Sequence, residues 1–241
     1  MLLLHALSAA VLPAPTPNSN QSLAFKRCHP SLREHVVVIG FGGRGRAAVD
    51  AMLAQGRRPG DIVAVDTDAA ALQTASCRGL LTCRGSATDH RALREAGIKR
   101  AAAVIVAVGQ DEAALSAARI VRDIADDVKV FVAVHDWEHA QLLRESDANT
   151  VVICEELAGR LLAAATTDPE IVVLIDDLLT PETGYVIAER TVERHEVGLA
   201  AQHLSDTVIG VVRDGWLTRA NMPAVGSLVS GDRILYVRLR K

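Results

Sequence analysis

Short apolar runs alternate with longer polar and apolar stretches along most of the chain, beginning at His35. The apolar runs are Val36–Ile39, Ile62–Val65, Leu80–Cys83, Ala103–Val108, Val130–Val134 and Val151–Cys154. Uninterrupted runs of this length are typical of strands that are buried on both faces of a parallel sheet. The pattern therefore predicts parallel strands at these six positions.

The stretches between these runs have the character of amphipathic helices. They are Arg46–Gln55, Asp68–Cys77, Asp89–Ala96, Asp111–Ala125, Asp136–Ser146 and Glu155–Ala165. Several begin at an aspartate that suits a helix N-cap, namely Asp68, Asp89, Asp111 and Asp136. Gly56 and Gly97 suit C-terminal stops. Strand–helix pairs in succession predict an α/β fold, a Rossmann-like doubly wound sheet of six parallel strands.

The pattern changes after Thr166, where Thr167–Pro169 interrupts the helical period. Strands are predicted further on at Tyr185–Val192, Val208–Val212 and Ile234–Leu239. The Asp214-Gly215 pair predicts a tight hairpin. This part should form a small α+β domain. The predicted organisation is a disordered apolar leader and Pro/Asn/Ser linker at 1–33, a nucleotide-binding domain at 34–166, and the small domain at 167–241.

Composition narrows the classes of function. Of 241 residues, 49% are hydrophobic and 23% are charged, which is a globular balance. The net charge of −3 and the 3% of aromatic residues argue against nucleic-acid and anionic-lipid partners. The cysteines form no C-x-x-C pair, which favours reduced thiols in a cytosolic protein. No basic residue precedes the apolar residues 1–12, so we expect a leader or a membrane-segment remnant rather than a signal peptide.

The strongest chemical signal is the glycine-rich segment Gly40–Gly45, which fits G-x-G-x-x-G between the first predicted strand and helix. In that motif Gly40 permits a tight turn, Gly42 lets the backbone approach a diphosphate, and Gly45 lets the helix pack on the strand. The helix N-terminus favours phosphate, and Arg44 could add charge-assisted hydrogen bonds. The alternative is a structural turn without a ligand.

Asp66 closes the second predicted strand, where an acid accepts hydrogen bonds from ribose hydroxyls. Its charge would repel a 2′-phosphate, which favours NAD(H) or an adenosine nucleotide over NADP. Alternatively, Asp66 only caps the next turn. The segments Gly85–Thr88 and Val108–Asp111 follow later strands and either meet the base and sugar or serve as plain connections.

The order of several segments resembles RCK domains, regulators of potassium conductance that are also called KTN or TrkA-N domains. The segments are HVVVIGFGGRGRAAV, VAVDTD, GSATDHRALREAGI and AAAVIVAV. Near the C-terminus, VVRDGWL and GDRILYVR resemble the companion RCK-C (TrkA-C) domain. The resemblance covers roughly residues 34–241.

The resemblance implies a cytoplasmic nucleotide-sensing regulator of potassium transport, held at the inner face of the cell membrane by a channel or transporter subunit. It also implies homodimers that can assemble as octameric rings, with NAD(H), ATP or ADP as the regulatory ligand. The predicted cofactor-binding residues are Gly40, Phe41, Gly42, Gly43, Arg44, Gly45, Asp66, Thr67, Ser86, Ala87 and Val108.

The sequence departs from the family pattern in two ways. Ser86 stands where the family loop Gly-Asp-Ala-Thr has its aspartate, and a hydroxyl is a weaker acceptor than a carboxylate. No potassium-filter sequence and no membrane-spanning stretch occur in the chain. We therefore expect a stand-alone regulatory subunit, or the soluble tail of a channel that has lost its membrane part.

The rival class is an NAD-dependent oxidoreductase, which needs an acid–base group near the nicotinamide. A Tyr-x-x-x-Lys pair is absent, because Glu189 follows Tyr185 and Arg240 follows Tyr236 at that spacing. The best candidate base, His195, is equally explained by an exposed charged loop. We therefore predict a protein without catalytic residues.

Metal binding has weak support in the sequence. His135 and His139 are one helical turn apart, but two histidines without a third ligand are a poor signal. The pairs Glu155-Glu156 and Asp176-Asp177 suit solvated surfaces better than a calcium site. We predict no metal site.

Two predicted helices are apolar almost all round, Asp111–Ala125 and Glu155–Ala165. Such helices are expected to be buried, either in the core of the chain or against a second copy.

Overall fold

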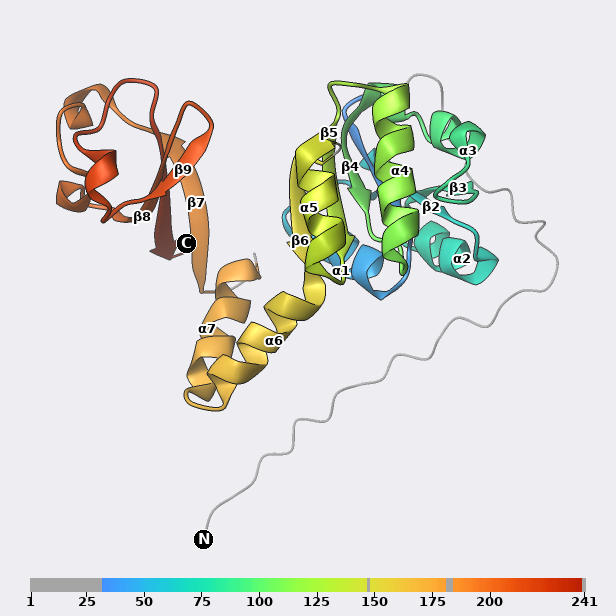
Figure 1. Ribbon diagram of the computed structural model, residues 1–241, viewed down its shortest axis with the longest axis horizontal. Coiled ribbons are helices and arrows are strands. Elements are labelled where there is room, and N and C mark those ends of the chain that lie inside the picture. Colours follow the sequence, from blue (N-terminus) through green and yellow to red (C-terminus); the bar gives the residue numbers. More distant parts are fainter. Residues whose placement is uncertain (1–31, 147, 181–183, 240–241) are drawn as a thin grey trace, which may run out of the picture.

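The computed structural model describes residues 32–146, 148–180 and 184–239 (Figure 1). A parallel sheet of six strands forms the N-terminal part, with the order β3-β2-β1-β4-β5-β6. Its strands are β1 His35–Ile39, β2 Ile62–Asp66, β3 Leu81–Arg84, β4 Ala101–Val106, β5 Lys129–Val134 and β6 Thr150–Ile153. The doubly wound parallel sheet predicted from the apolar runs is confirmed.

Helices cover both faces of this sheet. They are α1 Gly43–Ala54, α2 Ala69–Cys77, α3 His90–Glu95, α4 Asp111–Ile124 and α5 Trp137–Ser146. Alternate side chains of β1 point to opposite faces of the sheet and show which helices cover each face. Val37 and Ile39 pack with residues of α3, α4 and α5, whereas Val36 and Val38 pack with residues of α1 and α2. Both faces of β1 are therefore buried, as its uninterrupted apolar sequence requires.

Most helix starts follow the predicted caps, with one correction. Asp68 and Asp89 are N-caps and accept hydrogen bonds from Ala70 and Arg91. The N-cap of α4 is Gln110, and the predicted cap Asp111 is instead its first helical residue and is buried. Asp111 has other partners, described below, that draw its carboxylate away from the helix backbone.

The chain leaves the sheet through two helices, α6 Cys154–Ala165 and α7 Pro169–Leu179, which pack against each other (Figure 1). The sequence pattern predicts a break at Thr167–Pro169 and no helix directly after it. In the structure Pro169 begins α7, because proline at the first helical position loses no internal hydrogen bond.

Burial in the core of the same chain, one of the two alternatives predicted for the apolar helices, does not hold for α6, and burial against a second copy stays a prediction. All residues of α6 and α7 are described, and none of them is buried. Leu162 is 71% exposed and Val173 is 69% exposed. Helix α4, by contrast, buries one apolar face that includes Ala117 and Val121. Apolar composition predicted burial correctly only where the same chain supplies the covering surface.

The C-terminal part is an antiparallel sheet of four strands in the order β7-β10-β8-β9. The strands are β7 Tyr185–Thr191, β8 Thr207–Arg213, β9 Trp216–Arg219 and β10 Arg233–Leu239. Asp214 and Gly215 both have positive φ, 52° and 83°, as a two-residue type I′ hairpin requires. The predicted hairpin is confirmed.

A buried ionic cluster fastens β7 to the loops that cover the C-terminal sheet. The Arg190 guanidinium donates to both carboxylate oxygens of Glu196, at 2.7 and 2.6 Å, and also to Asp206. Glu196 further accepts the Glu193 backbone N–H at 2.8 Å. The hydrogen bonds from Arg190 lower the pKa of Glu196 to about 2, although burial opposes the shift.

We expect Glu196→Gln to lower the free energy of unfolding by about 3 kcal/mol, because it removes the buried charge that pairs with the partly buried Arg190 guanidinium. The folded-state pKa of Glu196 lies below its ordinary value of 4.5. Its stabilisation is therefore complete above about pH 4.5 and is lost as the pH falls toward about 2. Urea unfolding of the full chain at several pH values measures both effects.

Glu189→Gln is the matched control, because Glu189 pairs with Arg233 on the surface. An exposed pair of this kind contributes less than about 1 kcal/mol. Equal losses in the two variants would contradict the role given to the buried cluster.

Candidate functional site

The connections that follow β1 to β4 meet at the carboxyl edge of the parallel sheet and enclose a cleft of about 300 Å³. Strands β1 and β4 are neighbours, but their chains continue in opposite directions across the sheet, and ligands bind at such points in this fold. The cleft is lined by Gly40, Gly42, Val65, Asp66, Thr67, Gly85, Ser86, Ala87, Ala107, Val108 and Gly109.

Two glycines of the glycine-rich segment are required by packing. Gly40 has a φ of +91°, and a Cβ there would lie 2.9 Å from the carbonyl oxygen of Ala107. A Cβ on Gly45 would lie only 2.0 Å from the carbonyl oxygen of Gly40. These positions fix the turn and the close approach of α1 to β1, as the motif predicts.

Gly42 has a different reason to be glycine. A Cβ built on it meets no described atom within 4 Å, and its φ of −75° is open to any residue. Gly42 is the N-cap of α1 and lines the cleft, so the unpaired N–H groups of the first turn begin there. Neither packing nor backbone strain explains this glycine, whereas the close approach of a phosphate would.

Asp66 anchors the glycine-rich segment to the end of β2. Its Oδ2 atom accepts the Phe41 backbone N–H at 2.6 Å, and its Oδ1 atom accepts the Asp68 N–H at 2.9 Å. The carboxylate also lines the cleft. Each oxygen has a second lone pair, so Asp66 can hold the turn and accept from a ribose hydroxyl at once.

Ser86 lines the cleft from the connection after β3. Its hydroxyl accepts the Thr88 N–H at 3.2 Å and lies 2.9 Å from the Thr88 hydroxyl. Gly85 is needed before it, because a Cβ there would lie 2.2 Å from Cβ of Ala92 in α3. The segment is thus a rigid turn that presents a neutral hydroxyl, not a carboxylate, to the cleft.

Arg44 takes a direction that its place in the motif does not predict. It does not line the cleft, and its Nη2 atom lies 2.6 Å from Nε2 of His135 at the end of β5. The other ring nitrogen of His135, Nδ1, lies 2.7 Å from Oδ1 of Asp111. Because a guanidinium only donates, Nε2 of His135 accepts from Arg44 and its Nδ1–H donates to Asp111.

Asp111 is the fixed end of this chain of hydrogen bonds. Its carboxylate accepts the backbone N–H of His135 at 2.8 Å and that of Asp136 at 3.2 Å. Burial acts to raise the pKa of Asp111, but the hydrogen bonds from His135 and Asp136 outweigh it and hold the pKa below its ordinary value. Helix α1, strand β5 and helix α4 are therefore joined beside the cleft through Arg44, His135 and Asp111.

The structure separates the predicted site residues into two groups. Those that line the cleft are Gly40, Gly42, Asp66, Thr67, Ser86, Ala87 and Val108. Phe41, Gly43, Arg44 and Gly45 support the turn or face elsewhere; Phe41, for example, is fully buried. Four further residues line the cleft but are not among the predicted cofactor-binding residues, and each adjoins one that is: Val65, Gly85, Ala107 and Gly109. The alternative base His195 is exposed, 3.4 Å from Glu193, and does not line the cleft.

The sequence matches the TrkA-N domain family over residues 36–154. A putative K(+) efflux antiporter KefB of Alkalimonas amylolytica is 25% identical over 166 residues, 69% of this chain and 24% of the antiporter. A Trk system potassium uptake protein TrkA homolog of Methanothermobacter thermautotrophicus is 26% identical over 143 residues, 58% of this chain and 64% of the homolog. The chain thus spans less than two thirds of either relative.

Solved structures show the same fold. The human SLO3 gating ring has a TM-score of 0.64 at 11% identity and matches 85% of this chain and 44% of its own. A structure of GsuK bound to ADP has a TM-score of 0.52 at 22% identity and matches 59% of this chain and 37% of its own.

The sheet order and the cleft at the carboxyl edge define a Rossmann-like domain of the nucleotide-binding type. The match at residues 36–154 then identifies that domain as a TrkA-N domain. Among the residues that the structure describes, no helix is both long and apolar enough to cross a bilayer.

We expect Gly45→Ala to lower the free energy of unfolding by at least about 2 kcal/mol, because the new methyl group would overlap backbone that cannot move aside. Gly42→Ala meets open space and should cost less than about 1 kcal/mol. Thermal and chemical unfolding measure the difference. Similar losses at both positions would show that Gly42 is also held by packing.

Proposed function

We propose that the chain is a nucleotide-sensing regulator that controls potassium transport through a membrane channel or transporter. The observation that carries the proposal is the combination of a cleft at the switch point of a TrkA-N sheet with Gly42, a lining glycine that the fold itself does not require. Two relatives are named as a putative potassium efflux antiporter and a potassium uptake protein, which supports potassium transport as the regulated process.

An adenine nucleotide suits the cleft. The first turn of α1, beginning at Gly42, offers N–H donors for phosphate, and the Asp66 carboxylate offers an acceptor for ribose. Ser86 and Val108 lie where they would meet the sugar and base. A similar structure contains ADP, which supports ADP, ATP or NAD(H) as the ligand class.

Regulation suits the described residues better than catalysis. We infer that residues 34–166 hold the nucleotide and that residues 167–241 act as the companion RCK-C domain. Apart from Asp66, the side chains that line the cleft are aliphatic or carry only a hydroxyl, and the lining includes no histidine or lysine to serve as an acid–base group. The partner would be a membrane subunit, with this chain at its cytoplasmic face.

Helices α6 and α7 are proposed to hold two copies together. They expose Leu157, Leu162, Ile171, Val173, Leu174 and Leu179. Exposed apolar surface of this extent usually marks an interface. Helix α6 also begins beside the site, because Glu155 lies 3.7 Å from Nε2 of His135. A nucleotide that favours one arrangement of α1 and α6 would shift the population of the dimer toward it.

Calorimetric titration of the full chain with NADH, NAD, ATP, ADP and AMP tests the nucleotide site. We expect micromolar binding of at least one ligand. Asp66→Ala should weaken it about 10- to 100-fold through loss of a charged acceptor. Gly42→Ala should weaken it while leaving unfolding nearly unchanged. The control is Gly60→Ala, an open position outside the cleft.

No binding by any of these ligands would contradict the nucleotide proposal, and binding that survives both cleft variants would place the ligand elsewhere. The ranking of ligands identifies the signal that the protein senses.

A double variant with Leu162→Asp and Val173→Asp should convert the proposed dimer into monomers. Each new charge would have to be buried in the interface without a partner. We expect the dimer dissociation constant to rise at least about 30-fold, measured by sedimentation or light scattering. The control is Leu217→Asp on β9, which has similar exposure, 62%, outside these helices. A wild-type monomer, or equal effects of both changes, would contradict the proposed interface.

A further inference from the structure

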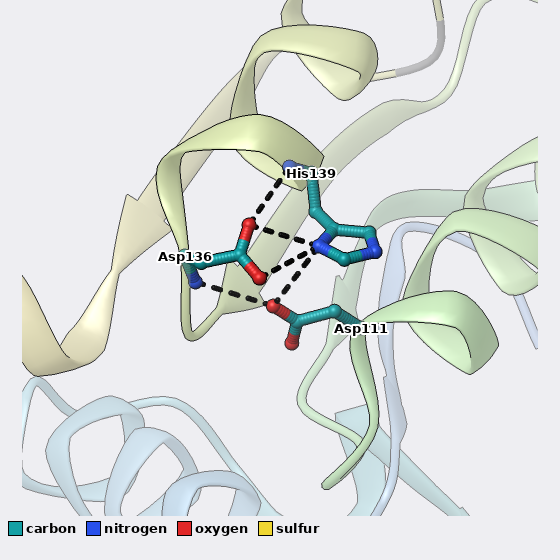
Figure 2. Close-up of side chains that lie close together, drawn as sticks. All are labelled: Asp111, Asp136 and His139. Atoms are coloured by element: carbon teal, nitrogen blue, oxygen red, sulfur yellow. Dashed lines mark hydrogen bonds and ion pairs between the residues drawn. The ribbon is translucent and has the colours of Figure 1, made fainter.

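Three side chains of types that can bind metal ions, two aspartates and a histidine, lie close together after β4 and β5 (Figure 2). Asp111 begins α4, Asp136 follows β5, and His139 lies in the first turn of α5. One ligand atom from each lies within 4.8 Å of the others. Nδ1 of His139 is 2.8 Å from Oδ2 of Asp136 and 3.7 Å from Oδ2 of Asp111. In Figure 2 the two carboxylates and the ring nitrogen converge on one point.

The most buried of the three, Asp111, is held in place before any ion arrives. Its side chain is 6% exposed, and its two oxygens accept hydrogen bonds from the backbone N–H groups of His135 and Asp136. The ring of His135 donates to Oδ1, so Oδ2 is the oxygen that faces His139. Hydrogen bonds of this kind orient metal ligands and raise metal affinity.

Asp136 contacts both the backbone and the ring of His139. Its Oδ1 atom accepts the His139 backbone N–H at 3.0 Å, which caps the first turn of α5. Its Oδ2 atom is the closer one to the His139 ring nitrogen. The cap therefore fixes the spacing of Asp136 and His139.

We propose that Asp111, Asp136 and His139 form a site for a divalent transition-metal ion of the zinc class. Nδ1 of His139 lies within hydrogen-bond distance of both Asp136 oxygens, and a metal ion would take the place of the proton between this nitrogen and the two carboxylates. Ligand bonds of about 2.0–2.2 Å in a tetrahedral site put ligand atoms about 3.4 Å apart, and the observed 2.8 and 3.7 Å lie on either side of that value.

The donor set selects the class of ion. Two oxygens and one imidazole nitrogen suit zinc and its neighbours, whereas calcium requires more oxygen ligands than these three side chains supply. Three protein ligands leave a fourth position for water or another group. His135 is hydrogen-bonded to both Arg44 and Asp111. An ion bound to Asp111 would therefore act on the same hydrogen bonds that position Arg44, beside the proposed nucleotide cleft.

The test is titration of the chelator-treated full chain with Co²⁺, followed by displacement with Zn²⁺. We expect visible absorption typical of tetrahedral Co²⁺, one ion per chain, and loss of the signal when Zn²⁺ is added. His139→Gln should weaken binding at least about 100-fold, since it removes the only nitrogen ligand. Asp136→Asn keeps the capping oxygen, so it should weaken binding without unfolding α5.

His90→Gln is the matched control, because His90 is an exposed histidine at the start of another helix, α3. It should bind Co²⁺ as the unaltered chain does. Absence of the absorption band would overturn the proposal. So would His139→Gln and Asp136→Asn variants that bind Co²⁺ as tightly as the unaltered chain does, and the cluster would then be only a helix cap with an ion pair. Gly42→Ala should bind the metal normally, so failure here is distinguishable from failure of the nucleotide site.

Discussion

The close approach of Gly45 to the carbonyl oxygen of Gly40 is the constraint on which the site depends. A Cβ at Gly45 would lie 2.0 Å from that oxygen, so α1 can begin directly above β1 only if no side chain intervenes. This start directs the first turn of α1 toward the carboxyl edge of the sheet. There, Asp66 accepts the Phe41 N–H and closes the turn from the neighbouring strand. With both ends of the segment fixed, Gly42 remains as an open position that needs no side chain for the fold.

Asp111 performs a comparable task on the other side of the switch point. Its buried carboxylate accepts hydrogen bonds from consecutive backbone N–H groups, those of His135 and Asp136, and from the His135 ring. A carboxylate in this position is stabilised as an anion, which is why its pKa is lowered despite burial. The same hydrogen bonds determine the tautomer of His135, and that tautomer allows it to accept from Arg44. The charge of Asp111 thus acts through His135 to orient the guanidinium of Arg44, which belongs to the glycine-rich segment.

Local patterns in the sequence predicted most of the fold, because the parallel strands are buried on both faces and leave uninterrupted apolar runs. The hairpin at Asp214-Gly215 and the glycine-rich turn were predictable for the same reason, since each depends on residues adjacent in sequence. The partner of Arg44 was not predictable, because His135 is 91 positions away and only tertiary packing joins them. Helix α7 was missed because Pro169 suits both a chain break and a first helical residue. Nor does composition show that α6 lacks a covering surface within its own chain.

The absence of burial along α6 and α7 has a physical consequence for regulation. Elements packed into a core have one arrangement, whereas these helices contribute no buried residue, so little in the described chain opposes their displacement. Helix α6 nevertheless begins at Cys154 and Glu155, beside His135 and Arg44. The first residues of α6 are therefore coupled to the sheet, whereas the position of the rest of α6 and of α7 depends on the surface that covers them. A ligand needs only a modest difference in affinity between two positions of such an element to change their populations. In the function proposed above, the parallel sheet would bind the nucleotide, and the uncovered helices are the part that could respond to it.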